Sequence, residues 1–137
     1  IPRDIHDIDL VDVAWNGDQL LLFSGTKSQM YRYSLSENRW LDTVLAPFEG
    51  QSSSDTTSVW TGEYFMTSGG NNRIGYLWDP ETDLWHKIAL KRNGLSGLGT
   101  IGREGVWAGD RFIQIMPSWY RSGYENLLYE YYPTFEN

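Results

Sequence analysis

The motif Trp-x-Gly-acid occurs three times in this chain of 137 residues, each time at the end of a short apolar run. Its copies begin at Trp15, Trp60 and Trp107, which are 45 and 47 residues apart. Self-similarity at a nearly fixed period of this length indicates a tandem array of one supersecondary unit. We therefore predict one domain made of three units, at about residues 10–46, 56–90 and 103–137, with residues 1–9 as an incoming connection.

Each unit repeats the same order of strands and turns. The dipeptides Asn16-Gly17, Thr61-Gly62 and Ala108-Gly109 suit two-residue hairpin turns, because glycine adopts a positive φ at little cost. Asn16-Gly17 is the strongest of these signals, since both of its residues tolerate the left-handed region. The predicted strands are 10–15, 19–23, 30–34 and 40–44, then 57–60, 64–67, 74–78 and 85–89, then 105–107, 112–116 and 127–132.

A second tryptophan follows the third strand of the first two units. Trp40 and Trp85 each stand 25 residues after the first tryptophan of their unit. In the second unit Asp79-Pro80 precedes it, where proline suits a type I turn and the Asp79 carboxylate is placed to accept a backbone N–H. Aligning Pro133 with Pro80 puts the corresponding tryptophan one position beyond Asn137. We therefore expect the third unit to lack its fourth strand in this chain.

Four antiparallel strands in a unit of about this length are typical of a β-propeller blade. The repeat resembles that of the kelch family, especially of bacterial kelch proteins, through a Gly-Gly pair, a Tyr in the third strand and a Trp after an Asp-Pro turn. The second unit carries all of these, as Gly69-Gly70, Tyr76, Asp79-Pro80 and Trp85. The first unit keeps one glycine, Gly25, and the third has Met116-Pro117 instead. The resemblance implies an all-β fold, with three four-stranded antiparallel units in an incomplete ring.

The composition agrees with strands and excludes several classes of function. Aromatic residues make up 15% of the chain and favour half-buried strands. The formal net charge of −7 argues against nucleic acid or an anionic membrane as the main partner, since both require a basic surface. The chain has no cysteine, which excludes disulfides and thiolate metal sites. Its apolar runs are too short to span a membrane.

Resemblance to kelch propellers implies that a ligand meets the loops between second and third strands and those between units. The ligand-binding candidates are therefore Asn71, Asn72, Arg73, Trp119, Tyr120, Arg121 and Tyr124. The aromatic insertion around Trp119 is typical of a recognition surface, although its rings would equally suit packing on the sheet. Arg73 and Arg121 fall at similar places and would suit a carboxylate ligand, or each pairs with a local acid such as Glu125.

Neither a metal nor a catalytic residue is predicted. His6 has too few neighbouring ligands in Asp4-Ile5-His6-Asp7 for a metal site, and no cofactor is expected. The repeated residues Trp15, Trp60, Trp107, Trp40 and Trp85, with Gly17, Gly62, Gly109, Gly69 and Gly70, are interpreted as structural. Trp119 breaks the repeat, so we predict that it contacts a ligand.

The leading hypothesis for function is a binding scaffold for a protein or a carbohydrate, with the compartment left open between secreted, periplasmic and other sites. The alternative is part of a sugar-active enzyme, for which Arg73, Arg103 and Glu104 would supply mutarotase-like chemistry; a copper oxidase is disfavoured without cysteine. A structural or designed fragment without a ligand is the third alternative. Three units leave an open arc, so we expect either further blades or a ring formed by two copies.

Overall fold

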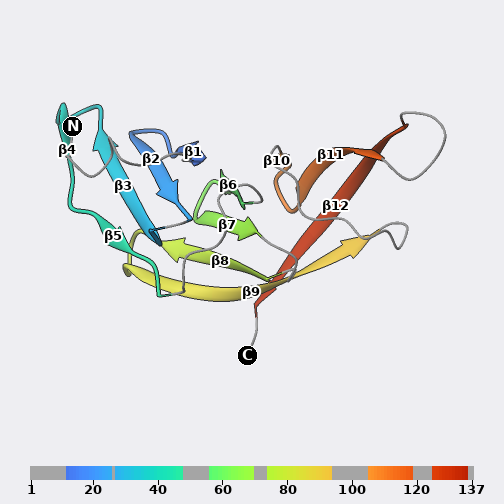
Figure 1. The fold of residues 1–137 in the computed structure, drawn as a ribbon. Helices are drawn as coiled ribbons and strands as arrows, with labels where there is room; N and C mark the ends of the chain where they lie inside the picture. The colour runs from blue at the N-terminus through green and yellow to red at the C-terminus, as the bar shows by residue number, and fades with distance from the viewer. Residues whose placement is uncertain are drawn as a thin grey trace.

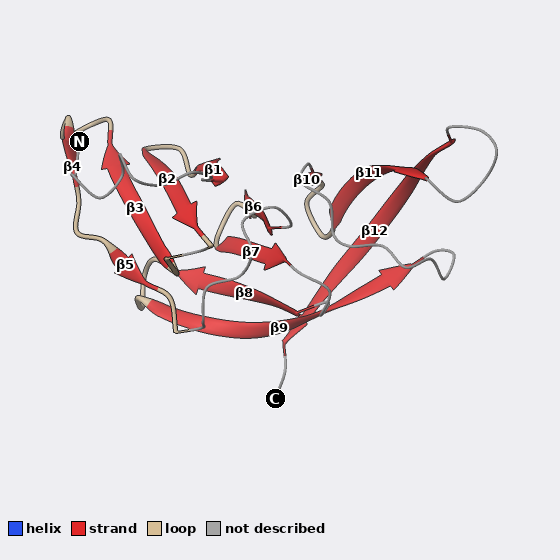
Figure 2. Ribbon diagram, viewed as in Figure 1, coloured by secondary structure: helices blue, strands red, loops and turns tan. Residues whose placement is uncertain are grey.

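The computed structural model describes residues 12–25, 27–47, 56–69, 74–93, 105–118 and 125–135. All regular elements in these ranges are β-strands, and no helix occurs among them (Figure 2). The strands pair antiparallel throughout and form two sheets. The predicted all-β, antiparallel fold class is therefore confirmed.

The first sheet holds the strands of the first unit. It contains β1 (Asp12–Trp15), β2 (Gln19–Ser24), β3 (Gln29–Ser34), β4 (Arg39–Trp40) and β5 (Val44–Leu45). The first four strands form a meander, and β5 also pairs with β3. The predicted fourth strand, 40–44, is divided because Trp40 opposes Tyr33 whereas Val44 opposes Met30, which leaves one extra residue on the outer strand. This β-bulge interrupts the ladder between β4 and β5.

The second sheet joins the second and third units. It contains β6 (Thr56–Trp60), β7 (Phe65–Gly69), β8 (Ile74–Asp79), β9 (Leu84–Asn93), β10 (Gly105–Trp107), β11 (Phe112–Ser118) and β12 (Glu125–Phe135), in the spatial order β10-β11-β12-β9-β8-β7-β6. The second and third units therefore share one continuous sheet. The strand β9 runs past the end of β8, and its other edge pairs with β12 from Ile88 to Asn93.

The three hairpin turns at the Trp-x-Gly-acid motif have one geometry. The predicted positive φ is confirmed at Gly17, Gly62 and Gly109, with values of 104°, 99° and 93°. In each turn the residue before the glycine donates its N–H to the carbonyl three residues later, at 2.8 to 3.2 Å. The two central residues are therefore Gly and the acid, not the predicted pair such as Asn16-Gly17. Asn16 does not adopt a positive φ; its side chain instead accepts hydrogen bonds from Asp18 and Gln19.

The turns before the second tryptophans also repeat. Asn38 and Asp83 occupy the left-handed region, with φ of 53° and 55°. Their side-chain oxygens accept hydrogen bonds from the residue five positions earlier, Tyr33 Oη at 2.6 Å and Trp78 Nε1 at 2.9 Å. The prediction for Asp79 is confirmed, because its carboxylate accepts the Glu81 N–H at 2.9 Å. Each turn is thus fixed by local side chains that repeat every 45 residues.

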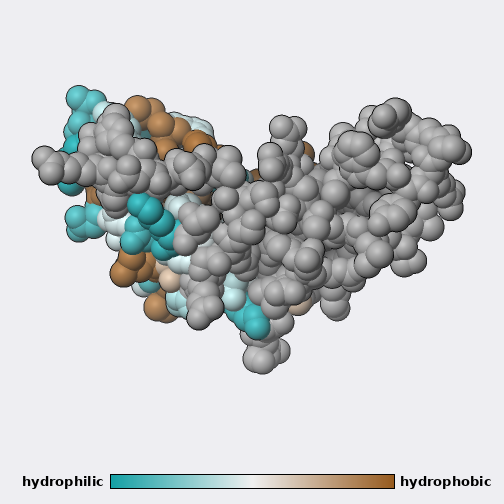
Figure 3. All heavy atoms as spheres, in the orientation of Figure 1, coloured by the Kyte–Doolittle hydropathy of each residue, from teal (hydrophilic) through white to brown (hydrophobic). Residues whose placement is uncertain are grey.

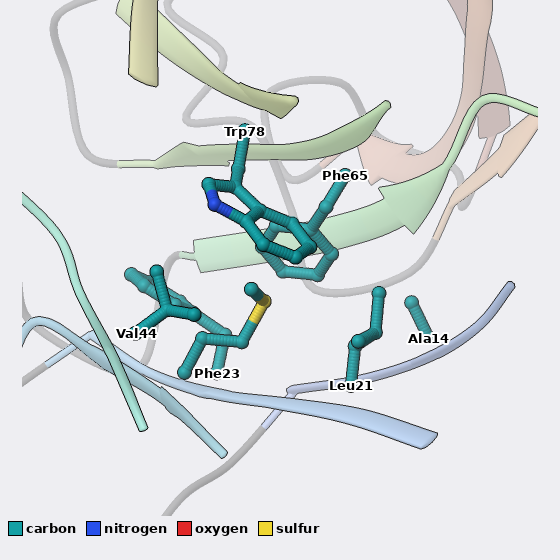
Figure 4. Close-up of a cluster of buried hydrophobic side chains, with 7 residues drawn as sticks. Ala14, Leu21, Phe23, Val44, Phe65 and Trp78 are labelled. Atoms are coloured by element: carbon teal, nitrogen blue, oxygen red, sulfur yellow. The ribbon is translucent and has the colours of Figure 1, made fainter. Parts of the chain in front are cut away.

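Two apolar cores lie between the three units and hold neighbouring units together. The core between the first and second units contains Ala14, Leu21, Phe23, Met30, Val44, Phe65 and Trp78 (Figure 4). The core between the second and third units contains Val59, Met66, Leu77, Ile88 and Phe112. Because successive side chains of a strand point to opposite faces, Phe65 and Met66 enter different cores, as do Trp78 and Leu77. The second unit is therefore covered on both of its faces.

The first strands of the three units lie side by side. β1 contacts β6, and β6 contacts β10, although β6 pairs with neither of them. These three strands lie on the concave side of the arc in Figure 1, whereas β4, β5 and β9 lie along its outside. A hydrogen bond of 3.1 Å from Ser58 Oγ to the Asp12 carboxylate connects the first two of them. The units thus fan out from a shared inner edge.

Candidate functional site

The ligand-binding candidates from the sequence lie outside the described residues. This holds for Asn71, Asn72, Arg73, Trp119, Tyr120, Arg121 and Tyr124, as well as for His6, Gly70, Arg103 and Glu104. The described strand ends that flank them are Gly69 and Ile74 in the second unit and Ser118 and Glu125 in the third. Both loops therefore connect the second strand of a unit to its third, at equivalent places in the repeat.

The motif tryptophans begin a row of side chains that crosses each unit on one face. In the second unit the row is Trp60, Phe65, Trp78 and Trp85, which oppose one another in the ladder. Phe65 and Trp78 are buried against the first unit, and Trp60 and Trp85 pack on the same core. In the third unit Trp107 and Phe112 start the row and pack against the second unit. We call this side of each unit its rear face.

The rear face of the first unit carries the same row but is open to solvent at its inner end. Register places Trp15, Leu20, Tyr33 and Trp40 in one line across β1 to β4. Trp15 is 45% exposed, and Val13, two residues earlier on the same face, is 57% exposed. On the side of the molecule drawn in Figure 3, hydrophobic atoms gather where Figure 1 draws β2, β3 and β5. This row is the candidate interaction surface of the described chain.

The opposite side of each unit is its front face, and in the first two units this face packs against the rear row of the following unit. Its cross-strand members are Ala14, Leu21 and Arg32 in the first unit, Val59, Met66 and Leu77 in the second, and Val106, Ile113 and Glu130 in the third. In the first unit Arg32 lies over the Trp78 ring of the second, 5.6 Å from its centroid. In the third unit Val106 is 62% exposed, so the inner end of this front face is also open.

A polar cluster around Arg111 occupies the front face of the third unit. The guanidinium bonds to Asp110 at 2.8 Å, to the Tyr132 hydroxyl at 2.7 Å and to Glu130 at 3.3 Å. It also lies 5.1 Å from the centroid of the Tyr132 ring. The hydrogen bonds with Arg111 lower the pKa of Asp110, and the Asp110 carboxylate in turn raises the pKa of Arg111. The guanidinium is therefore fully paired, and the two carboxylates leave the cluster with a net charge of −1.

The acidic residue of the motif has a different partner in each copy. Asp18 accepts hydrogen bonds from Ser34 and from the Ser36 N–H, and so joins the first turn of its unit to the second. Glu63 accepts a hydrogen bond from Tyr64, which raises the pKa of that phenol. Asp110 pairs with Arg111. Since the partners differ, the acid does not form one repeated chemical site.

Other site types find little support in the described ranges. Within them, no three His, Cys, Asp or Glu side chains are grouped so that they would hold a metal ion. Nor does any helix there have the length and apolar character needed to cross a membrane. The sequence interpretation of Trp15 and Trp40 as structural did not indicate that Trp15 is exposed at the inner end of the rear face. Its signal was present, since the alternation of Val13 and Trp15 with Ala14 indicates a strand with two apolar faces.

The comparisons with known proteins leave the family open. No protein-family model matches the chain. No curated protein matches it significantly either. The resemblance to kelch repeats therefore depends on the repeated residues themselves.

Proposed function

We propose that the chain is a segment of a kelch-like β-propeller that acts as an interaction scaffold. The observation that carries this proposal is the face-to-face packing of the units around their first strands. The second unit buries Phe65 and Trp78 against the first unit and Met66 and Leu77 on its other face. In a propeller, four-stranded sheets are arranged radially around a common axis, and this packing supports such an arrangement.

We further propose that the loops between second and third strands present the ligand, a protein or a carbohydrate. The equivalent positions of residues 70–73 and 119–124 between described strands support this placement. Trp119 offers a large ring for stacking on a sugar or packing on a peptide, and Arg121 offers a bidentate donor for a carboxylate. Rigid strands that carry variable loops are a common basis of recognition.

The test is a binding screen of the whole chain against immobilised glycans and peptides, followed by titration of each hit. We expect Trp119→Ala to weaken binding by about tenfold or more, because an aromatic anchor supplies much of the energy of such a contact. Trp119→Phe, which keeps a ring, should retain most of the affinity. Leu35→Ala serves as the control, since it removes an exposed apolar side chain from a turn of the first unit instead.

Two outcomes would contradict the proposal. Binding that is unchanged in Trp119→Ala would exclude the loop of the third unit as the ligand site. The absence of any hit with the folded wild-type chain would favour a scaffold without a ligand of these classes.

A further inference from the structure

Among the three hairpin turns of the motif, the first alone carries a side-chain amide before its glycine. The pair is Asn16-Gly17 in the first unit, Thr61-Gly62 in the second and Ala108-Gly109 in the third. An asparagine amide reacts with its own backbone when the nitrogen of the next residue attacks Cγ and closes a succinimide ring. Glycine favours this step because it has no Cβ to crowd the attacking nitrogen. In a folded chain the reaction depends on what holds the amide and the glycine nitrogen.

Two backbone donors hold the carbonyl oxygen of the Asn16 side chain. Asp18 N donates to Oδ1 at 3.1 Å, and Gln19 N donates to it at 2.7 Å. When a nucleophile adds to Cγ, negative charge develops on this oxygen, and donors that are already aimed at it stabilise the charge. The turn therefore offers at Asn16 Oδ1 what an oxyanion hole offers in acyl transfer.

The attacking nitrogen and the leaving group are both unengaged. In the part of the chain that the structure describes, neither the Gly17 N–H nor the Asn16 Nδ2 group has a hydrogen-bond partner. Gly17 is exposed, and an atom at its Cβ position would meet nothing within 4 Å apart from the chain neighbours. Water and hydroxide therefore reach this nitrogen. The turn itself is fixed within the first unit, by Asn16 N on Gln19 O and by Leu35 N on Asp18 O.

We infer that Asn16 is a modification site, at which the folded chain converts the amide to aspartate and isoaspartate with water as the co-reactant. Hydroxide removes the Gly17 amide proton, and the nitrogen forms a bond to Asn16 Cγ. The electron pair on Oδ1 then re-forms the carbonyl while the Cγ–Nδ2 bond breaks, and ammonia leaves with a proton from water. Water opens the ring at either carbonyl: attack at Cγ gives aspartate, and attack at the Asn16 backbone carbonyl gives isoaspartate.

The two products differ in their effect on the turn. Aspartate in place of Asn16 adds a negative charge but keeps an oxygen that accepts the two backbone N–H groups. Isoaspartate routes the main chain through Cβ and so adds one atom to the backbone between Trp15 and Gly17. The pairing of Trp15 with Leu20 across the hairpin then no longer matches the length of the turn. Isoaspartate therefore loosens the hairpin of β1 and β2, whereas aspartate preserves it.

The experiment incubates the folded 137-residue chain at mildly alkaline pH in heavy-oxygen water and maps its tryptic peptides by mass spectrometry. Trypsin separates residues 4–27, which contain Asn16, from residues 33–39, which contain Asn38. We expect the first peptide to take up heavy oxygen and to become a substrate for enzymatic methylation of isoaspartate. Asn16 should react about tenfold or more faster than Asn38, whose following residue, Arg39, has a side chain beside the attacking nitrogen.

Asn16→Thr is the matched control, because the second unit shows that threonine holds the same turn. Thr61 Oγ1 accepts the N–H of Glu63 at 3.4 Å and that of Tyr64 at 2.9 Å, as Asn16 Oδ1 does in the first turn. The variant keeps an acceptor and removes the amide, so residues 4–27 should take up no heavy oxygen. Incubation should lower the thermal-unfolding midpoint of the wild type and leave that of Asn16→Thr unchanged.

A parallel incubation of the chain unfolded in urea tests the role of the turn. Asn16 should react faster in the folded chain, because the two donors to Oδ1 are fixed there before the reaction begins. An equal or faster reaction in urea would overturn the inference, since the fold would then give the amide no assistance. So would a folded chain in which Asn38 is modified and Asn16 is not.

Discussion

The two boundaries between units are built differently, although the units share one repeat. Between the first and second units two separate sheets meet face to face, and Phe23, Phe65 and Trp85 place their rings 5.9 to 6.4 Å apart. Between the second and third units the faces also pack, but β9 and β12 additionally pair edge to edge for six residues. The comparison shows that side-chain packing is common to both boundaries, whereas backbone pairing is specific to one of them.

The largest effect is expected from removing the buried phenylalanine at each boundary, Phe65 at the first and Phe112 at the second. Phe65→Ala and Phe112→Ala each empty a site that is fully buried, so each should lower the free energy of unfolding by about 3–5 kcal/mol. Hydrogen exchange should separate the two variants. Phe65→Ala is expected to expose the amides of β1 to β3, because no backbone pairing between the described strands joins the first unit to the second.

Phe112→Ala should leave the amides between β9 and β12 protected, because their ladder does not depend on that side chain. If either variant loses amide protection at both boundaries, the two boundaries do not differ in the way proposed.

The second prediction concerns the close contact between β8 and the outer strand β9 in the second unit. A Cβ at Gly75 would lie 3.0 and 3.1 Å from side-chain carbons of Ile88 and 3.2 Å from the Thr67 carbonyl oxygen. Gly75→Ala should therefore lower the free energy of unfolding by about 1–3 kcal/mol, through overpacking. Thermal unfolding measures the loss. Adding Ile88→Val, which removes the nearby Cδ1, should recover part of it; a double variant less stable than the sum of both losses would exclude this explanation.

The third prediction concerns the hairpin turns of the motif. The turn at Ala108 lacks the hydrogen bond that a side-chain oxygen accepts in the other two turns. Thr61 Oγ1 accepts the Tyr64 N–H at 2.9 Å, whereas Ala108 has no side-chain acceptor. Thr61→Ala should cost about 0.5–1.5 kcal/mol of stability, the usual net value of such a hydrogen bond. Ala108→Thr should stabilise the third turn by a similar or smaller amount. Denaturant titration measures the free energy of unfolding of both variants, and Thr61→Ser is the control that keeps the hydroxyl acceptor. If Ala108→Thr is less stable than the wild type, the turns are not equivalent.

The smallest effect concerns acid stability. The pKa of Asp79 is lowered chiefly by the hydrogen bond from the Glu81 N–H, and that of Asp110 chiefly by hydrogen bonds from Arg111. A carboxyl group with a lower pKa in the folded state stabilises the fold above its unfolded pKa, near 4, and loses this contribution as the pH falls through the folded value. Stability should therefore decline below about pH 4, and less so in Asp79→Asn and Asp110→Asn.

Salt should distinguish the two carboxyl groups. The exposed ion pair of Asp110 is screened at high ionic strength, whereas the local hydrogen bond of Asp79 is affected less. An equal salt dependence of the two variants would contradict this assignment of causes.

Much of the local structure was predictable because it depends on residues close in sequence. The positive φ of Gly17, Gly62 and Gly109 followed from the motif, and so did the acceptor role of Asp79. The turn at Asn16 was displaced by one residue, because the Asn side chain binds backbone N–H groups and does not need the left-handed region itself.

The candidate site could be predicted less well. The ligand loops were selected from the resemblance to kelch propellers, and Trp119 also because it breaks the repeat; these loops lie outside the described residues. The open row at Trp15 does follow the repeat, so a comparison of units makes it look like every other row. The row differs from the others because no described strand covers its inner end. This exposure depends on the position of the unit in the stack and not on the residues of the row.

By itself the sequence determined the period, the turns and the antiparallel strands, because these depend on backbone preferences and on side chains a few residues apart. Only the tertiary structure decided how the units are joined. The extended β9 has two edges with free hydrogen-bonding groups, and pairing with β12 satisfies the second edge over Ile88 to Asn93. The tertiary structure also decided which apolar rows are buried, since rows at equivalent positions of the repeat become core or surface according to whether a neighbouring unit lies against them.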